Sequence, residues 1–228
     1  MTNTNPLKIA VLVSGNGSNL QVLIDKQLNN TLNMDIVGVI SNKADAYALT
    51  RAKSANISTF VIDKDDNGKT YKRVEFEKRA LDILRELQPD LVVLAGFMKI
   101  LTPLFIGGVN NELNIPMINL HPSILPAYKG LDTHARVLKT GDNLHGCSVH
   151  LVTEELDAGA VIATAVTQVK NNETADELQG RIHTLEHKIL PMVVGWFAGG
   201  IVAVENDKLT SKLGVELPIK ILETTPNL

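Results

Sequence analysis

The stretch "KIAVLVSGNGSNL", residues 8–20, joins a continuous apolar run to a turn that contains two glycines and then to the start of a helix-like segment. A continuous apolar run is typical of a strand that is buried on both faces of a sheet. In an open parallel sheet, the turn after such a strand lies at the carboxyl edge, where ligands bind. The stretch therefore predicts an α/β fold with a candidate site at its first turn.

The same alternation continues along the chain. Short β-branched apolar runs lie at 34–40, 58–62, 90–96 and 116–120. Segments with helical character lie at 18–29, 44–55 and 70–87, the last with a stripe of Phe76, Ala80, Ile83, Leu84 and Leu87. Alternating strands and helices predict a doubly wound, mostly parallel, Rossmann-like sheet.

The later strands depart from this pattern. The runs at 146–152 and 160–169 are separated by too few residues for a helical crossover, so we expect an antiparallel C-terminal strand pair in a mixed sheet. We expect one α/β domain over residues 1–200. Residues 201–228 are expected to extend the same domain, with a small hairpin around "ENDK".

A long C-terminal helix is predicted over 174–198. Thr174 and Glu177 form the pattern of a capping box at its start. Pro191 lacks a backbone N–H and is expected to bend or divide this helix.

The bulk composition excludes several classes of partner. The 228 residues carry 22 Lys plus Arg against 25 Asp plus Glu, and the net charge of −3 gives no broad footprint for nucleic acid or an anionic membrane. No apolar run approaches the roughly 18 residues that span a bilayer. The single cysteine, Cys147, cannot form an internal disulfide, and the N-terminal sequence lacks a secretory pattern. We expect a cytoplasmic protein that acts on small molecules.

The first turn, "SGNGSNL" at 14–20, is a candidate anion site. Glycines let the backbone approach a ligand, and Ser18 and Asn19 can cap the helix and donate to an anion at its N-terminus. Leu20 stands where the dinucleotide fingerprint requires a third glycine, and no P-loop Gly-Lys-Ser/Thr follows. The turn favours a monophosphate over a dinucleotide, and the alternative is a tight turn without a ligand.

Polar groups also gather at the end of the run "PMINL". Asn119 and His121 are followed by a proline-braced turn, and Asp157 lies in "TEELDAG" between the antiparallel strands. The three supply a carboxamide donor, a titratable imidazole and an orienting carboxylate, but no protein nucleophile. They suit a reaction in which an amine of the substrate attacks an acyl carbon. Ordinary turn chemistry is the alternative for Asp157.

Three other sequence features have a possible functional role and a simpler structural explanation. "HTLEH" at 183–187 matches an inverted zinc-peptidase pattern, but the chain after His187 offers no helical third ligand. "DKDDNG" at 63–68 begins like a calcium loop, yet Val74 occupies the position that requires glutamate, which favours a solvated turn. Cys147 is expected to be a small buried apolar residue. We therefore expect no metal.

Taken together, these segments resemble the folate-dependent phosphoribosylglycinamide formyltransferases of purine synthesis. The similarity runs from about residue 8 to residue 200. It rests on the ordered set "SGNGSNL", "SNKADA", "PDLVVLAGFMKIL", "INLHPSILP", "HGCSVHLVTEELDAG" and, in the long helix, "EH". The family's catalytic residues match Asn119, His121 and Asp157.

The resemblance implies transfer of a formyl group from 10-formyltetrahydrofolate, the co-substrate, to the glycinamide amine, without a covalent enzyme intermediate. Asn119 would donate to the developing oxyanion. His121 would polarise that oxygen and move a proton, and Asp157 would fix the imidazole tautomer and favour its charged form. Related hydrolases share these residues, so a formyltetrahydrofolate hydrolase is the nearest alternative, and a zinc peptidase on His183 and His187 is a distant one.

The resemblance also implies the binding residues. The substrate phosphate would lie on Gly17, Ser18 and Asn19, and Glu186 would hold the ribose or the glycinamide. The folate would lie along a larger set: Arg73, Met98, Lys99, Ile100, Leu101, Asn119, Thr153, Glu154, Glu155, Leu156 and Asp157. The assembly implied is a monomer or a homodimer.

The sequence departs from the family pattern at two places. Ala127 and Lys129 stand where the family commonly has a basic residue and then a proline, and the loop at 106–116 looks longer than usual. We expect these departures to change loop details and to leave the reaction unaffected.

Overall fold

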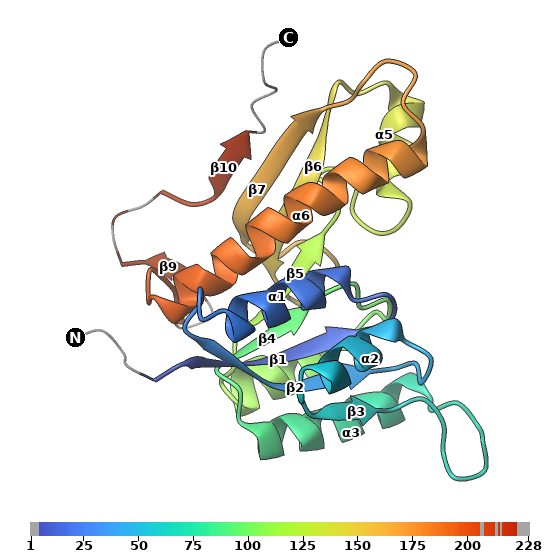
Figure 1. The fold of residues 1–228 in the computed structure, drawn as a ribbon, viewed down its shortest axis with the longest axis vertical. Helices are drawn as coiled ribbons and strands as arrows, with labels where there is room; N and C mark the ends of the chain where they lie inside the picture. Colours follow the sequence, from blue (N-terminus) through green and yellow to red (C-terminus); the bar gives the residue numbers. More distant parts are fainter. Residues whose placement is uncertain (1–4, 206–207, 213, 215, 223–228) are drawn as a thin grey trace.

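The computed structural model describes residues 5–205, 208–212, 214 and 216–222. Its main sheet has eight strands in the order β10-β7-β6-β5-β4-β1-β2-β3, with helices on both faces (Figure 1). The strands are β1 (Leu7–Val13), β2 (Met34–Ser41), β3 (Thr59–Val61), β4 (Leu91–Leu94), β5 (Met117–His121), β6 (Leu144–Leu151), β7 (Val161–Gln168) and β10 (Ile219–Leu222).

The strand directions confirm the predicted mixed sheet. Strands β3, β2, β1, β4 and β5 are parallel neighbours. The pair β6–β7 is antiparallel, as the short connection between the last two predicted strands required, and β5–β6 is antiparallel as well, which was not predicted. Strand β10 joins β7 in parallel and was not predicted, because four residues near the end of the chain carry little periodic signal.

A separate two-stranded sheet follows the long helix. Strands β8 (Val202–Glu205) and β9 (Lys208–Ser211) pair antiparallel, which confirms the predicted hairpin; its turn, 206–207, lies outside the described residues. Val202 belongs to the buried core, and Val204 and Leu209 pack against it.

The helices agree with the sequence where they are long. They are α1 (Ser18–Leu28), α2 (Tyr47–Ser54), α3 (Arg73–Leu87), α4 (Pro103–Gly107), α5 (Thr133–Thr140) and α6 (Ala175–Ala198). Helices α4 and α5 were not predicted, and α4, with five residues, is too short to show a helical period. The expected loop at 106–116 is largely helical: α4 continues into a π-helical turn at Gly108–Glu112, which accommodates extra chain within a helix.

Helix α6 begins as the sequence predicts. Thr174 accepts from the Glu177 N–H, and the Glu177 side chain accepts from the Thr174 N–H. Pro191 does not divide the helix, which continues to Ala198. Pro191 and its neighbours Leu190 and Val193 are buried, so packing compensates for the one backbone hydrogen bond that proline removes.

The core has two parts, one on each face of the sheet. Side chains of α1, α2 and α6 pack on one face, and those of α3 and α4 pack on the other. The predicted stripe of α3 is confirmed: Phe76, Ala80 and Leu84 are buried, and Ile83 and Leu87 pack at its margin. Both faces are thus covered, which leaves the carboxyl edge of the parallel strands for ligands.

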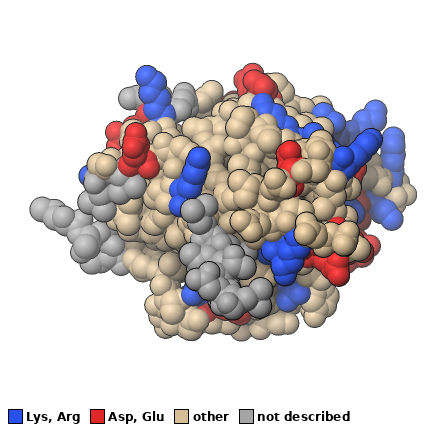
Figure 2. Space-filling view, turned by 90° about the horizontal axis from the view of Figure 1, so that it is seen from above, with Lys and Arg blue, Asp and Glu red and all other residues tan. Residues whose placement is uncertain are grey.

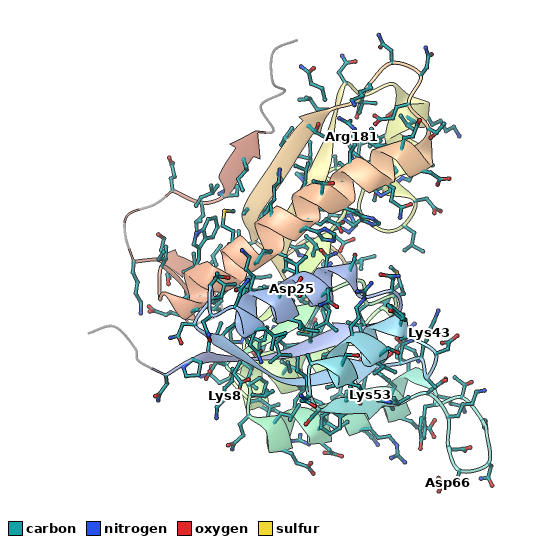
Figure 3. The ribbon with its side chains drawn as sticks, in the orientation of Figure 1. Lys8, Asp25, Lys43, Lys53, Asp66 and Arg181 are labelled. Carbon is teal, nitrogen blue, oxygen red and sulfur yellow. The ribbon has the colours of Figure 1, made fainter. Side chains whose placement is uncertain are left out.

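The surface is polar and of mixed charge. Figure 2 shows cationic and anionic side chains interspersed over one face of the molecule. The segment at 63–68 is a turn, as predicted: Asp65 accepts the N–H groups of Asn67 and Lys69, and Asp66 lies out in the loop (Figure 3). Within the described part of the chain, no helix is both long and apolar enough to cross a bilayer.

Candidate active site

The structure brings Asn119, His121 and Asp157 together. Asn119 and His121 are two residues apart on β5, so their side chains point to the same face of the sheet. Asp157 lies in the connection between β6 and β7, and its Oδ2 is 3.5 Å from Nδ1 of His121. Side chains from a parallel strand and a later connection thus meet at one edge of the sheet, as the sequence predicted.

His121 has a fixed partner at each ring nitrogen. Its Nε2 lies 2.9 Å from the Tyr128 carbonyl oxygen, and because a carbonyl only accepts, Nε2–H is the donor. We expected Asp157 to fix the tautomer, but the Tyr128 carbonyl does so. Burial lowers the pKa of His121, whereas Tyr128 and Asp157 oppose that shift. Near neutral pH the ring is therefore neutral, with a basic lone pair on Nδ1.

Asn119 is oriented by His150, which sequence reasoning left outside the site. His150 lies opposite Asn119 in the β5–β6 register. Its Nδ1, 2.8 Å from the Leu151 carbonyl oxygen, must donate, so in the neutral ring Nε2 accepts from Asn119 Nδ2 at 3.1 Å. One amide hydrogen of Asn119 is left for a ligand. Antiparallel pairing of the two predicted strands was the signal that could have found His150.

Asp157 is held as a carboxylate by several neighbours. Burial on its own raises the pKa of Asp157, but the surroundings lower it: the Gly130 N–H donates to the carboxylate, and the imidazoles of His150 and His121 favour its charged form whenever they carry a second proton. The Gly130 N–H donates to Oδ2 at 2.9 Å, and His150 Nε2 lies 3.6 Å from Oδ1. Backbone groups of Tyr128 and Gly130 therefore bind both members of the His121–Asp157 pair. The residue types in the sequence did not predict these two backbone contacts.

The predicted anion site lies at the start of α1. The first turn of α1 has no acidic residue, and Gly17 caps it without a side-chain hydrogen bond, so its N–H groups are available to an anion. Asn19 Nδ2 donates to Glu186 Oε2 at 2.8 Å. Burial raises the pKa of Glu186, while Asn19 opposes the shift. The structure thus joins Asn19 and Glu186, which lie far apart in the sequence.

Gly17→Ala is expected to lower the free energy of unfolding by about 1–3 kcal/mol. Gly17 has φ +75°, and an added Cβ would lie 2.5 Å from the Cβ of Ala48. Urea unfolding measures the effect. Gly15→Ala is the matched control, because a Cβ there meets nothing within 4 Å. Equal stability of the two variants would contradict the expectation.

The residues predicted to bind folate form two groups. Met98, Lys99, Ile100 and Leu101 follow β4, where Met98 and Ile100 are exposed and Leu101 is buried. Arg73 begins α3, and Phe76 of the same helix stacks on Phe97 and lies under the Lys99 ammonium. The second group, Thr153, Glu154, Glu155, Leu156 and Asp157, lies in the β6–β7 connection.

A hydrogen-bond network links the first folate group to the anion turn. Ser14 Oγ accepts the Met98 N–H at 2.8 Å and donates to Asn42 Oδ1 at 2.6 Å. On the other side of the turn, Arg51 donates to the carbonyl and side-chain oxygens of Asn16. Three loops at the carboxyl edge are thus held together, and this link was not predicted.

The glutamate of the zinc-peptidase pattern has another partner. His183 and His187 lie on α6, but Glu186 between them is bonded to Asn19. Among the residues that the structure describes, no three of the types His, Cys, Asp and Glu are grouped so as to hold a metal ion. Cys147 is buried, as expected for a small apolar residue. Burial raises the pKa of its thiol, which disfavours the reactive thiolate.

His145→Gln is expected to make stability less dependent on pH. The ring of His145 is buried and its Nε2 lies 2.9 Å from His134 Nδ1; burial lowers its pKa to about 4. Between about pH 6.5 and 4 the unfolded chain binds this proton and the folded chain does not, so stability falls as the pH falls. Urea unfolding from about pH 7.5 to 4.5 tests this. Identical slopes for both proteins would contradict it.

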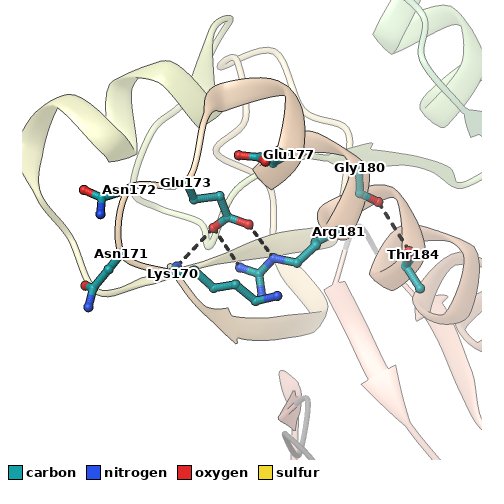
Figure 4. A pocket seen from close by; sticks show the side chains of 8 residues that line it. All are labelled: Lys170, Asn171, Asn172, Glu173, Glu177, Gly180, Arg181 and Thr184. Atoms are coloured by element: carbon teal, nitrogen blue, oxygen red, sulfur yellow. Dashed lines mark hydrogen bonds and ion pairs between the residues drawn. The ribbon is translucent and has the colours of Figure 1, made fainter.

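A separate hollow of about 470 Å³ lies at the start of α6 (Figure 4). None of its lining residues belongs to the predicted site. Glu173 and Arg181 of its lining pair with each other, and Glu173 also accepts from the Lys170 backbone N–H. We therefore assign it no ligand.

Known proteins are similar to this chain over most of its length. A family model described as "Formyl transferase" matches residues 7–194. The phosphoribosylglycinamide formyltransferase of Escherichia coli (strain K12) is 43% identical over 199 residues, which cover 85% of this chain and 88% of that protein.

Solved structures give the same result. That of the phosphoribosylglycinamide formyltransferase of Coxiella burnetii has a TM-score of 0.80 and 42% identity, covering 91% of this chain and 94% of that one. The enzyme of the same name from Anaplasma phagocytophilum has a TM-score of 0.82 and 34% identity, covering 96% of this chain and all of that one.

Proposed function

The chain belongs to the formyl transferase family, and from this membership we propose that it transfers the formyl group of 10-formyltetrahydrofolate to the amine of phosphoribosylglycinamide. The products are phosphoribosyl-N-formylglycinamide and tetrahydrofolate, a step of purine synthesis. The relatives described above support this assignment, because they are named as that enzyme and are similar to this chain over most of its length.

One structural observation carries the catalytic part of the proposal. Asn119, His121 and Asp157 meet at the end of β5 with a free amide hydrogen, a basic imidazole nitrogen and an ionised carboxylate. The group contains no serine or cysteine nucleophile. It suits direct attack by the substrate amine, with the protein stabilising charge and moving a proton.

The reaction proceeds through a tetrahedral intermediate. The amine lone pair attacks the formyl carbon, and the carbonyl electrons move onto oxygen, where the remaining Asn119 amide hydrogen stabilises the negative charge. The amine then loses a proton. As the oxyanion electrons re-form the formyl carbonyl, the bond from the formyl carbon to the folate N10 breaks; its electron pair stays on N10, which takes up the proton that the amine released.

His121 is suited to this proton transfer through Nδ1. Its Nε2–H is committed to Tyr128, so Nδ1 is the nitrogen that can accept a proton. Burial lowers the pKa of His121 and keeps the base free near neutral pH. Asp157, 3.5 Å away, stabilises the imidazolium once it forms.

The binding residues follow from the same geometry. We place the substrate phosphate on the N-terminus of α1 at Gly17, Ser18 and Asn19, and the ribose or glycinamide on Glu186. Asn19 Oδ1 is buried and has no hydrogen-bond partner among the described residues; because it can only accept, it suits a hydroxyl or amine of the substrate, whereas the phosphate would bind the backbone N–H groups. We place the folate between the 98–101 segment and the 153–157 segment, with its glutamate tail near Arg73.

We also propose how the chain is organised and where it acts. Residues 1–200 form one domain, and 201–228 extend it; the pairing of β10 with β7 and the packing of Val202 in the core support this. The chain acts in the cytoplasm as a monomer or a homodimer without a metal. Sedimentation velocity measures the oligomeric state.

An absorbance assay tests the function. Purified protein is mixed with 10-formyltetrahydrofolate, with and without phosphoribosylglycinamide, and with no added metal. Deformylation only in the presence of phosphoribosylglycinamide is the expected result. Deformylation without it would indicate the hydrolase, and no reaction in either case would overturn the proposal.

A further inference from the structure

The backbone that supports His121 and Asp157 has an unfavourable conformation. Tyr128 has φ +55°, Gly130 has φ +83° and Asp132 has φ +56°. Left-handed backbone is costly for residues other than glycine, above all for a bulky residue such as tyrosine. Such a conformation persists only when other contacts stabilise it. These contacts matter for the site, because the Tyr128 carbonyl and the Gly130 N–H of this segment bind His121 and Asp157.

Arg136 of α5 provides such contacts. Its Nη1 donates to the Lys129 carbonyl at 2.6 Å and to the Leu131 carbonyl at 3.2 Å. Its guanidinium carbon lies 5.4 Å from the centre of the Tyr128 ring. One side chain thus contacts three residues of the 128–131 segment.

The two carbonyls that Arg136 binds lie beside the supporting groups in the chain, and the Lys129 carbonyl belongs to the same peptide group as the Gly130 N–H. The Lys129 carbonyl lies between the Tyr128 carbonyl and the Gly130 N–H in the chain, and the Leu131 carbonyl follows Gly130. A rigid guanidinium that binds both fixes the direction of the peptide groups between them.

Other contacts anchor the ends of the segment. Tyr128 Oη hydrogen-bonds to Thr140 and Asp142, and Lys129 Nζ pairs with Glu155 at 3.0 Å. These contacts keep the segment folded onto the protein when Arg136 is removed. They do not bind the peptide groups beside Gly130.

We propose that Arg136 is a positioning residue, which aims the Tyr128 carbonyl at His121 and the Gly130 N–H at Asp157. The role rests on the proposed function, since it acts through the catalytic pair. Arg136 itself does not touch the reacting atoms.

Arg136→Met tests the proposal, because methionine keeps an apolar stem but has no N–H donors. We expect kcat to fall about ten- to hundredfold, with each KM within about threefold of wild type, since misplaced catalytic groups slow the reaction more than they weaken binding. Guanidinium ion added at millimolar concentration is expected to restore part of kcat. Arg136→Lys, which keeps the charge and a donor, should give an intermediate value.

Arg79→Met is the matched control. Arg79 of α3 is also an exposed arginine over a tyrosine ring, 4.5 Å from the centre of Tyr71, and it has no contact with the 128–131 segment among the described interactions. Its replacement is expected to leave kcat unchanged. An equal fall in kcat in both methionine variants would overturn the proposal.

A spectroscopic measurement tests the contact without relying on turnover. The ¹⁵N shifts of the His121 imidazole, assigned with His121→Asn, report which nitrogen carries the hydrogen. In wild type we expect hydrogen on Nε2, and in Arg136→Met a larger share on Nδ1. If wild type does not transfer the formyl group but the ¹⁵N shifts of His121 change in Arg136→Met as expected, the proposed function is wrong and the positioning role stands. Unchanged shifts and unchanged kcat, or failure of Arg136→Met to fold, would overturn the positioning role.

Discussion

His121→Asn is expected to lower kcat by about 10²–10⁴-fold while the protein stays folded. An asparagine places its amide near the position of the imidazole Nδ1 and does not reach the Tyr128 carbonyl, which Nε2 contacts at 2.9 Å in wild type, so this variant loses that hydrogen bond as well as the imidazole. The asparagine amide cannot accept a proton near neutral pH, which removes the base that Nδ1 supplies. Steady-state kinetics with 10-formyltetrahydrofolate and phosphoribosylglycinamide measure the loss, and circular dichroism checks the fold.

His145→Gln is the control for this variant. His145 is another buried histidine with a lowered pKa, but its partner is His134 and it lies outside the proposed catalytic group. Its replacement is expected to retain turnover near pH 7.5 while changing acid stability. The assignment of His121 would be wrong if His121→Asn kept turnover within a few-fold of wild type.

The fold was predictable where local patterns are strong. The apolar runs at 8–14 and 34–40 and the stripe of α3 report burial directly, because strands buried on both faces and amphipathic helices have distinct periods. Helix α4 and strand β10, with five and four residues, are too short to repeat a period. The effect of Pro191 depended on the core around α6, which a local rule does not include.

The candidate site also has a part that the sequence predicted and a part that it did not. Asn119, His121 and Asp157 could be named from the sequence because their chemistry is in their side chains. The Tyr128 carbonyl and the Gly130 N–H act through backbone atoms that every residue possesses, so residue types carry no signal for them. His150 required the strand register, since only the pairing of β5 with β6 places it opposite Asn119.

Asn119→Ala is expected to lower kcat by about 10²–10³-fold, the usual effect of removing one oxyanion donor. In wild type, His150 holds one hydrogen of the Asn119 amide at 3.1 Å, which aims the other toward the ligand. That hydrogen interacts more strongly with the oxyanion than with the formyl carbonyl, so the loss falls on kcat and each KM changes little. Steady-state kinetics measure the split. Asn29→Ala, at the remote end of α1, is the control and should retain wild-type values.

The double variant of Asn119→Ala with His121→Asn separates a catalytic from a structural role for the amide. If both residues act on one tetrahedral intermediate, the double variant loses less than the product of the single losses, because the second change removes a contribution that already depended on the first. If Asn119 only kept His150 in place, His150→Ala would reproduce the full loss of Asn119→Ala. Equal losses in those two variants would therefore contradict the oxyanion role of Asn119. A much smaller loss in His150→Ala would support it, since the amide can still rotate toward the oxyanion without its partner.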